Sequence, residues 1–351
     1  MPHRYARCLL LGASLSLAFV PAAFAQTSPP ASPADRAAAA AAALAPIRDE
    51  APVTVTGTQP GPGLWKVAKG DHVLWVLGTQ SPLPKRMQWH STEVEGAIAA
   101  SQEVIYPPSL GISVDTGGFF RSLLLVPKMY GARKNPDGKT LRDVLPPALY
   151  ARWLPLREHY LGRGASAERM RPLFAAGELW EEALDDNDLA ASGIVMPVIR
   201  RAVKAHGLRE TSPKKILKIT DPKALLAEME HAQLEDTQCL QATVQRLEGG
   251  PDRLKARANA WAIGDIAALR TLPDTDQNGA CADAAMESPA LRKRGGAGID
   301  AEVERLWLDA AEKALAGNAS TFAVLPIGNL LSGDGYLSKL AALGYEVTEP
   351  E

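Results

Sequence analysis

The sequence predicts an α/β fold in which strands from the two ends of the chain form one mixed sheet around a helical middle region. Strand-like runs at 64–67 and 72–77 open the folded part, and strand-like runs at 321–325 and 345–348 close it. Between them, apolar residues recur at helical spacing, as over 194–203. Strands at both ends with helices between them favour one domain whose termini pair in the same sheet.

The N-terminal elements have recognisable local signals. The turn residues 69–71 separate the first two strand-like runs and predict a hairpin. A helix is predicted to begin at Thr92, because Thr92 and Glu95 fit a capping box. The apolar strand at 103–106 is predicted to stop at the two prolines that follow it.

The later elements follow from periodicity and from turn residues. A helix is predicted to end at His206-Gly207, where a glycine commonly terminates a helix. Another helix is expected over 301–315. The C-terminal order is predicted as strand, loop over 326–333, helix over 335–343, and strand.

Residues 1–25 have the pattern of a cleavable secretory signal peptide. Arg4 and Arg7 precede an apolar run that is too short to span a bilayer, and Ala23-Phe24-Ala25 fits a cleavage site after Ala25. Residues 26–62 are rich in proline and alanine and are predicted to be a linker. The folded domain is therefore expected to span 63–351, in the periplasm or outside the cell.

The charge balance and the cysteines agree with an exported protein. Removing residues 1–25 removes two positive charges and no acids, so the formal net charge moves from −2 to −4. There is no basic stripe for nucleic acid and no later apolar segment long enough for a membrane span. Loss of Cys8 leaves Cys239 and Cys281, which predict a disulfide in an oxidising compartment rather than two unpaired core thiols.

The expected domain contains a set of short motifs at both of its ends and in its middle. They are Leu64-Trp65-Lys66-Val67, Val76-Leu77-Gly78-Thr79, Val94-Glu95, Gly193-Ile194, Ala260-Trp261, Gly264-Asp265, Gly328-Asn329-Leu330 and Gly344-Tyr345-Glu346-Val347. The set resembles the TraB/GumN family over roughly residues 63–350. The resemblance implies a fold related to the Tiki-like metallohydrolases, with a divalent-metal site made of histidines and acidic residues.

The chain departs from the family pattern at each position that the resemblance assigns to this site. After Gly78-Thr79-Gln80 the family has His, and Ser81 stands here. The acid after the strand at 103–105 is replaced by Tyr106 or Pro107, and a second acid by Lys218. Asn329 replaces the C-terminal His.

One further pair of residues in the family pattern is also absent from this chain. An Arg-Asn pair of the family falls on Val303-Glu304 in this chain. A divalent ion needs His nitrogens and carboxylate oxygens that converge on one point, whereas Ser and Asn are weak ligands and Lys repels a cation. We therefore expect no cofactor, and a divalent metal only if these positions are matched differently. The residues of this altered cleft are Thr79, Ser81, Tyr106, Lys218 and Asn329.

Three functional hypotheses follow. The first is a non-catalytic binding or accessory protein of the envelope, whose cleft takes a peptide, a glycan or a partner protein. The second is a hydrolase with altered chemistry, in which Lys218 acts as base for Ser81. The alternative for this residue is that Lys218 is simply a surface residue in a basic run. The third is a metal-dependent peptidase like the family's relatives. Neither the natural ligand nor the oligomeric state follows from the sequence.

Overall fold

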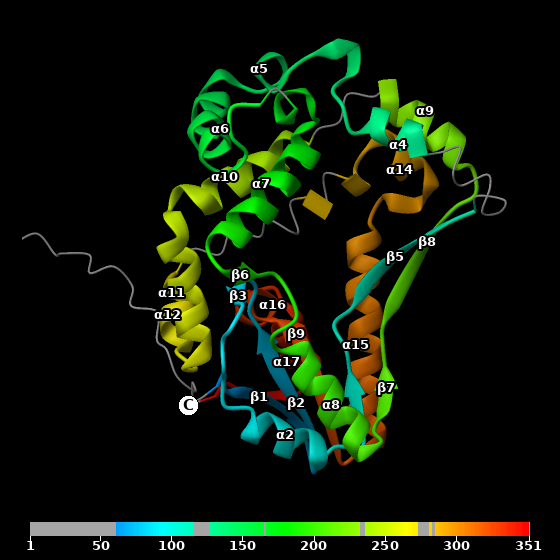
Figure 1. The fold of residues 1–351 in the computed structure, drawn as a ribbon. Coiled ribbons are helices and arrows are strands. Elements are labelled where there is room, and N and C mark those ends of the chain that lie inside the picture. The colour runs from blue at the N-terminus through cyan, green and yellow to red at the C-terminus, as the bar shows by residue number, and fades with distance from the viewer. Residues whose placement is uncertain are drawn as a thin grey trace, which may run out of the picture. The chain divides into compact units, whose positions relative to one another are not determined.

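In the computed structural model of this chain, the two ends of the domain meet in one mixed sheet (Figure 1). The structure describes residues 61–115, 126–164, 166–231, 236–272, 281–282 and 285–350. These residues all belong to a unit that spans 51–351. The predicted signal peptide and the linker up to residue 60 lie outside the described residues.

Among the described residues, six strands form the central sheet in the order β10-β1-β2-β9-β4-β7. The strands are β1 (Leu64–Lys69), β2 (His72–Thr79), β4 (Glu103–Ile105), β7 (Arg209–Thr211), β9 (Ser320–Pro326) and β10 (Glu346–Thr348). β1 is antiparallel to β2 and to β10, and β2, β9, β4 and β7 run parallel. The mixed sheet and the pairing of the two termini confirm the predicted fold class.

The N-terminal hairpin is confirmed. Gly70 has φ +63, a backbone angle that glycine adopts without steric cost, and it makes the tight turn between β1 and β2. Trp65 of β1 and Leu74 and Val76 of β2 are fully buried beneath the helices that cover the sheet.

The first helix begins as predicted but is capped differently. α2 (Thr92–Ala99) has Ser91 at its N-cap, and no side chain caps the backbone there. The Ser91 hydroxyl donates instead to Glu95 Oε1 at 2.5 Å, so the predicted capping box between Thr92 and Glu95 is wrong. The reason is spacing, because Glu95 lies one helical turn beyond Ser91 and contacts its side chain rather than its amide.

Helices α2, α8, α15 and α17 pack on the sheet around the main core. Their bounds are Met196–His206 for α8, Ile299–Gly317 for α15 and Tyr336–Ala342 for α17. α8 ends at Gly207, which has the left-handed conformation expected of a C-terminal glycine. The loop predicted over 326–333 contains a short helix, α16 (Ile327–Leu331), because Ile327 and Leu330 are buried against β2 and β9.

Two strands extend beyond the central sheet as a separate ribbon. β4 is followed by Pro107-Pro108 and then by β5 (Ser109–Val114), and β7 is followed by β8 (Lys214–Ile219). β5 and β8 are parallel partners of each other. The two prolines therefore stop β4 as predicted, but the chain continues as a strand directly after them. Figure 1 shows the ribbon running from the sheet toward α4, α9 and α14.

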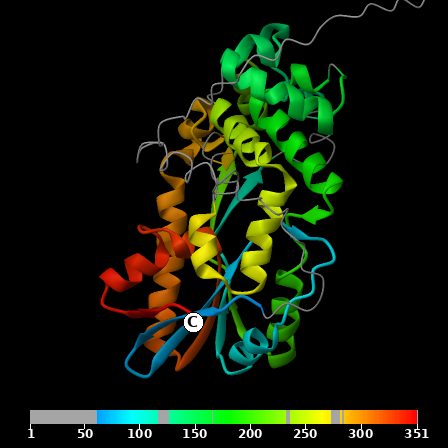
Figure 2. The ribbon, with the colours of Figure 1, turned by 90° about the vertical axis from the view of Figure 1, so that its left-hand side faces the viewer.

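The helices of the middle region are α4 (Val126–Ala132), α5 (Leu141–Val144), α6 (Pro147–Tyr160), α7 (Pro172–Asp186), α9 (Pro222–His231), α10 (Thr237–Glu248), α11 (Gly250–Ala262), α12 (Ile266–Thr271) and α14 (Pro289–Leu291). Of these, α5, α6, α7 and α10 contribute most of a second apolar core, and α14 contributes to a smaller third core beside β8. α7 contributes an apolar stripe of Leu179, Trp180 and Ala183, while its acidic residues face solvent. Figure 2 shows the yellow α11 and α12 on the side turned toward the viewer. None of the helices in the described ranges is long and apolar enough to cross a membrane.

Candidate functional site

The carboxyl ends of three parallel strands meet at one edge of the central sheet. Thr79 ends β2 opposite Pro326 at the end of β9, and Ile105 ends β4 opposite Ala323 of β9. Ligands of open α/β sheets bind outside this edge. Four of the predicted cleft residues follow from it directly: Thr79, Ser81, Tyr106 and Asn329.

Two hydroxyl groups at the end of β2 are used in structural hydrogen bonds. Thr79 Oγ1 donates to the carbonyl oxygen of Leu325 at 3.3 Å, which ties β2 to β9. Ser81 Oγ donates to the carbonyl oxygen of Ala191 at 2.9 Å. The Ser81 hydroxyl therefore holds the chain after β2 against the segment after β6 (Leu189–Ala190).

The side chain of Tyr106 is held by an acidic neighbour. Its hydroxyl donates to Glu210 Oε2 at 2.9 Å, across the pair β4 and β7. Burial and the hydrogen bond to the Glu210 carboxylate raise the pKa of Tyr106 to about 12. The phenol is therefore neutral at physiological pH and is a poor ligand for a cation.

Lys218 lies away from the other predicted residues. It is exposed on β8 and is paired in register with Ser113 of β5. It stands seven residues beyond Thr211, which corresponds to about 23 Å of extended chain. Within the described ranges, no hydrogen bond or ion pair joins Lys218 to Ser81. The geometry of a Ser–Lys catalytic pair is not assembled here.

Asn329 has a different environment from the hydroxyl-bearing residues. It lies on α16, directly after β9, and buried Ile327 and Leu330 on either side of it anchor that helix. Its side chain is half-buried, and its amide has no hydrogen-bond partner among the residues that the structure describes. An accessible amide of this kind can both donate to and accept from a ligand.

A pocket of about 320 Å³ opens beside the end of β2. Its lining residues come from the segment after β2 and from α10 and α11: Gln80, Pro82, Gln245, Arg246, Glu248, Arg253, Leu254 and Arg257. The Trp261 Nε1 donates to the carbonyl oxygen of Gly78 at 2.7 Å and so fixes α11 against β2. The pocket therefore adjoins the same sheet edge as Thr79 and Ser81.

Arginine side chains dominate the polar part of this lining. Arg257 is buried, and its Nε donates to Gln80 Oε1 at 3.1 Å. Arg246 donates to the carbonyl oxygen of Ser81 at 2.9 Å and stacks on Trp180, with 4.9 Å between guanidinium and ring centre. Arg253 is exposed. The one acidic lining residue, Glu248, accepts two hydrogen bonds from Arg152, at 2.7 and 2.6 Å.

No sequence signal singled out these arginines. Arg253 and Arg257 are spaced four residues apart on α11, and this spacing is equally common on an ordinary solvated helix face. Arg257 differs only in being buried, which depends on α12 and on Gln80 packing over it. Only the tertiary structure places that residue in the pocket.

The residues at the sheet edge do not fit the divalent metal that the family resemblance implies. Ser81 and Tyr106 donate their hydroxyl hydrogens to protein acceptors, and Asn329 offers a single amide. No group of three or more His, Cys, Asp or Glu residues within the described ranges is arranged to hold a metal ion. A catalytic zinc-type site normally has three such protein ligands.

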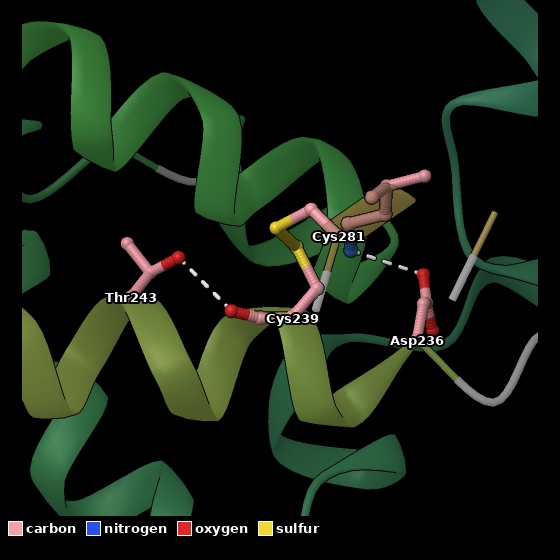
Figure 3. Close-up of a disulfide and its surroundings, with 5 residues drawn as sticks. Asp236, Cys239, Thr243 and Cys281 are labelled. Carbon is pink, nitrogen blue, oxygen red and sulfur yellow. Dashed lines mark hydrogen bonds between the residues drawn. A yellow bond between two sulfur atoms is a disulfide. The ribbon is translucent and has the colours of Figure 1, made fainter. Parts of the chain in front are cut away.

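The predicted disulfide between Cys239 and Cys281 is confirmed (Figure 3). Cys239 is fully buried on α10, in the second apolar core, and its carbonyl oxygen accepts from Thr243 Oγ1 at 2.9 Å. Near it, buried Asp236 accepts from the backbone amide of Leu173 at 3.0 Å and joins α10 to α7. The bridge therefore lies in the helical region, remote in sequence from the sheet edge.

The comparisons with known proteins agree with these motifs. The model of the TraB/PrgY/gumN family matches residues 63–349. No curated protein and no solved structure matched the chain. Because the family match covers nearly the whole described domain, including both strand ends that build the site edge, the chain belongs to the TraB/PrgY/gumN family.

Proposed function

We propose that this chain is an exported envelope protein that binds a ligand at the carboxyl edge of its central sheet and does not hydrolyse it. The observation that carries the proposal is the difference between the hydroxyl groups and the amide group at this edge. The hydroxyls of Thr79, Ser81 and Tyr106 are engaged in structural hydrogen bonds, whereas the Asn329 amide is accessible and unengaged within the described ranges. The edge thus presents a binding group without a poised nucleophile.

A nucleophilic serine needs a base within hydrogen-bond reach that can take its proton. The Ser81 hydroxyl donates to a backbone carbonyl, which cannot take a proton, and Lys218 lies along the ribbon. This arrangement disfavours the second hypothesis, a Ser–Lys hydrolase. The poor donor set at the edge disfavours a metal-dependent peptidase in the same way.

Two features support the location. The disulfide between Cys239 and Cys281 is typical of an oxidising compartment. Residues 1–25 have the composition of a secretory signal, although they lie outside the described residues. We infer a periplasmic or secreted protein.

The pocket beside β2 favours a ligand that carries an acidic group. Arg253 is exposed and has no ion-pair partner among the described residues, and its guanidinium matches the geometry of a carboxylate or phosphate. An acidic peptide, an acidic glycan or an acidic patch of an envelope protein all present this chemistry.

The test uses the purified mature protein. Metal content is measured by mass spectrometry, thermal melts are recorded with added zinc, manganese or cobalt, and hydrolysis of generic peptide and ester substrates is followed. We expect no stoichiometric metal, no rise in melting temperature and no turnover. Stoichiometric metal with a stabilising shift would restore the metallohydrolase, and turnover that is lost in Ser81→Ala would restore the serine mechanism.

A further inference from the structure

The β5–β8 ribbon has an open edge next to the central sheet. Within the described residues, β5 pairs with β8 alone. β5 continues β4, which is flanked by β9 on one side and β7 on the other, so the open edge of β5 is on the β9 side. β9 ends at Pro326 and enters α16, so none of the strands that the structure describes pairs with β5 on that side (Figure 1).

The backbone groups of this edge can be assigned from the register. The amide of Ser109 donates to Pro213 at 3.0 Å, and the amide of Asp115 donates to Ile219 at 2.8 Å. In a parallel pair, alternate residues direct both backbone groups to the same partner. The intervening residues of β5 therefore direct their N–H and C=O groups to the open edge; they are Leu110, Ile112 and Val114.

The side chains beside this edge are apolar on one face of the ribbon. Ile112 and Val114 are 54% and 47% exposed, although their register partners Leu217 and Ile219 are buried under α15 and the segment after α14. Exposed apolar side chains on an edge strand are unusual, because the open edge of such a strand invites pairing with another chain.

The other face of the ribbon carries a cation at the same edge. The side chain of Lys214, from β8, crosses over Gly111 of β5, and its Nζ lies 3.1 Å from the position that a Cβ of Gly111 would occupy. The absence of a side chain at Gly111 makes room for this arrangement. Among the described residues, Lys214 has no carboxylate within ion-pair distance.

We propose that the open edge of β5 is a docking surface for an extended acidic segment of a partner protein, which adds to the ribbon as a further strand. The added strand would lie about 4.8 Å from β5, in line with the direction of β9. Its backbone would pair with the outward groups of Leu110, Ile112 and Val114. Its alternate side chains would meet the apolar pair on one face and the Lys214 ammonium on the other.

Strand addition explains these features together. Backbone groups at strand spacing match a polypeptide, since main-chain hydrogen bonds supply affinity and alternate side chains supply specificity. The unpaired Lys214 beside the edge favours glutamate or aspartate at the facing positions. This surface is independent of whatever binds near Asn329, so its test does not depend on the proposed function.

The probe is a fluorescein-labelled peptide of alternating valine and glutamate, and binding to the full mature protein is followed by fluorescence anisotropy. Ile112→Pro removes an outward N–H and places a ring on the edge, while the amides that donate to β8 remain, so the β5–β8 ladder persists. Ile112→Ala is the matched control, because it shortens the same side chain and keeps the N–H. We expect Ile112→Pro to weaken binding at least about tenfold and Ile112→Ala to weaken it clearly less.

A second variant tests the charge of Lys214 without changing the backbone groups of β5. Lys214→Gln should weaken the valine–glutamate peptide by about two- to fivefold and leave a valine–glutamine peptide unchanged. The proposal is overturned if the wild-type protein binds neither peptide, or if Ile112→Pro and Ile112→Ala bind equally well.

A second copy of this chain is the competing occupant of the same edge. Size-exclusion chromatography with light scattering distinguishes it. A monomeric wild-type protein that binds the peptide supports the partner segment. A dimer that dissociates in Ile112→Pro, and that does not bind the peptide, would overturn it in favour of self-association.

Discussion

Glu103 is the most heavily bonded carboxylate of the central sheet. It lies buried at the start of β4, and it accepts from Arg209 at 2.5 Å, from Asn318 at 2.8 Å and from Thr211. These donors belong to β7 and to the short segment between α15 and β9, so one carboxylate joins three neighbouring segments. Its role is structural and is separate from the site at the opposite end of the strands.

The change Glu103→Gln replaces a charged acceptor by an amide that cannot accept from all three donors. We expect the free energy of unfolding to fall by about 1–3 kcal/mol, since hydrogen bonds to charged groups are worth about this much. Urea denaturation measures the change. Glu346→Gln is the control, because Glu346 is exposed on β10, and it should alter the stability by less than about 0.5 kcal/mol.

The stabilisation from Glu103 should also depend on pH. Burial raises the pKa of this carboxyl, but the bonds from Arg209, Thr211 and Asn318 outweigh it, so the pKa lies below its ordinary value of 4.5. A depressed pKa adds stability above the unfolded value and loses it as the pH falls through the folded value. The difference between wild type and Glu103→Gln should therefore be constant from about pH 7 to 5 and shrink below 4.5. A difference that grows on acidification would contradict this.

At the scale of elements, the disulfide anchors α10 to the segment at Cys281. The bridge closes a loop with a sequence separation of 42. By the loop-entropy model, such a loop stabilises the fold by roughly 3–4 kcal/mol. We expect the double variant Cys239→Ala/Cys281→Ala to lose this amount in urea denaturation. Wild type with reductant should lose a similar amount, while the double variant should be insensitive to reductant; stability that is unaffected in both cases would contradict the prediction.

Two helix glycines should respond in opposite ways to the same change. Neither Gly96 in α2 nor Gly207 after α8 has an atom within 4 Å of an added Cβ, so space does not distinguish them. Gly207 has φ +62, which strains any other residue, whereas Gly96 is in an ordinary helical position. We expect Gly207→Ala to destabilise and Gly96→Ala to stabilise, each by about 0.5–1 kcal/mol. Thermal melts of the two variants measure this, and shifts of the same sign would refute the argument.

At the scale of the whole molecule, the sheet depends on both ends of the domain. β10 pairs with β1 along Lys66, Val67 and Ala68, and Val67 is fully buried. Truncation after Tyr345 removes β10 and exposes the edge of β1. We expect a folded protein with a lower urea midpoint and a concentration-dependent tendency to associate, measured by light scattering. A truncated protein with wild-type stability and no association would show that the terminal pairing is dispensable.

The elements with local signals could be predicted from the amino-acid sequence. The turn at Gly70, the end of α8 at Gly207 and the pairing of Cys239 with Cys281 depend on neighbouring residues or on the number of cysteines, and the structure confirms each of them. The pairing of the termini also followed, because strand-like runs at the two ends need each other to bury their apolar faces. The family motifs, which lie in these same elements, are equally visible in the sequence.

Which side chains share the site depends on long-range packing and could not be predicted from the sequence. The sequence-based grouping of Ser81 with Lys218 required the strand bearing Lys218 to end at the sheet edge, but the chain continues past Thr211 into the ribbon. The burial of Arg257 and the position of Asn329 on α16, where its amide has no partner among the described residues, likewise depend on contacts between segments far apart in the sequence. Hydrogen-bond partners and burial are properties of long-range packing, and residue spacing along one chain carries no record of them.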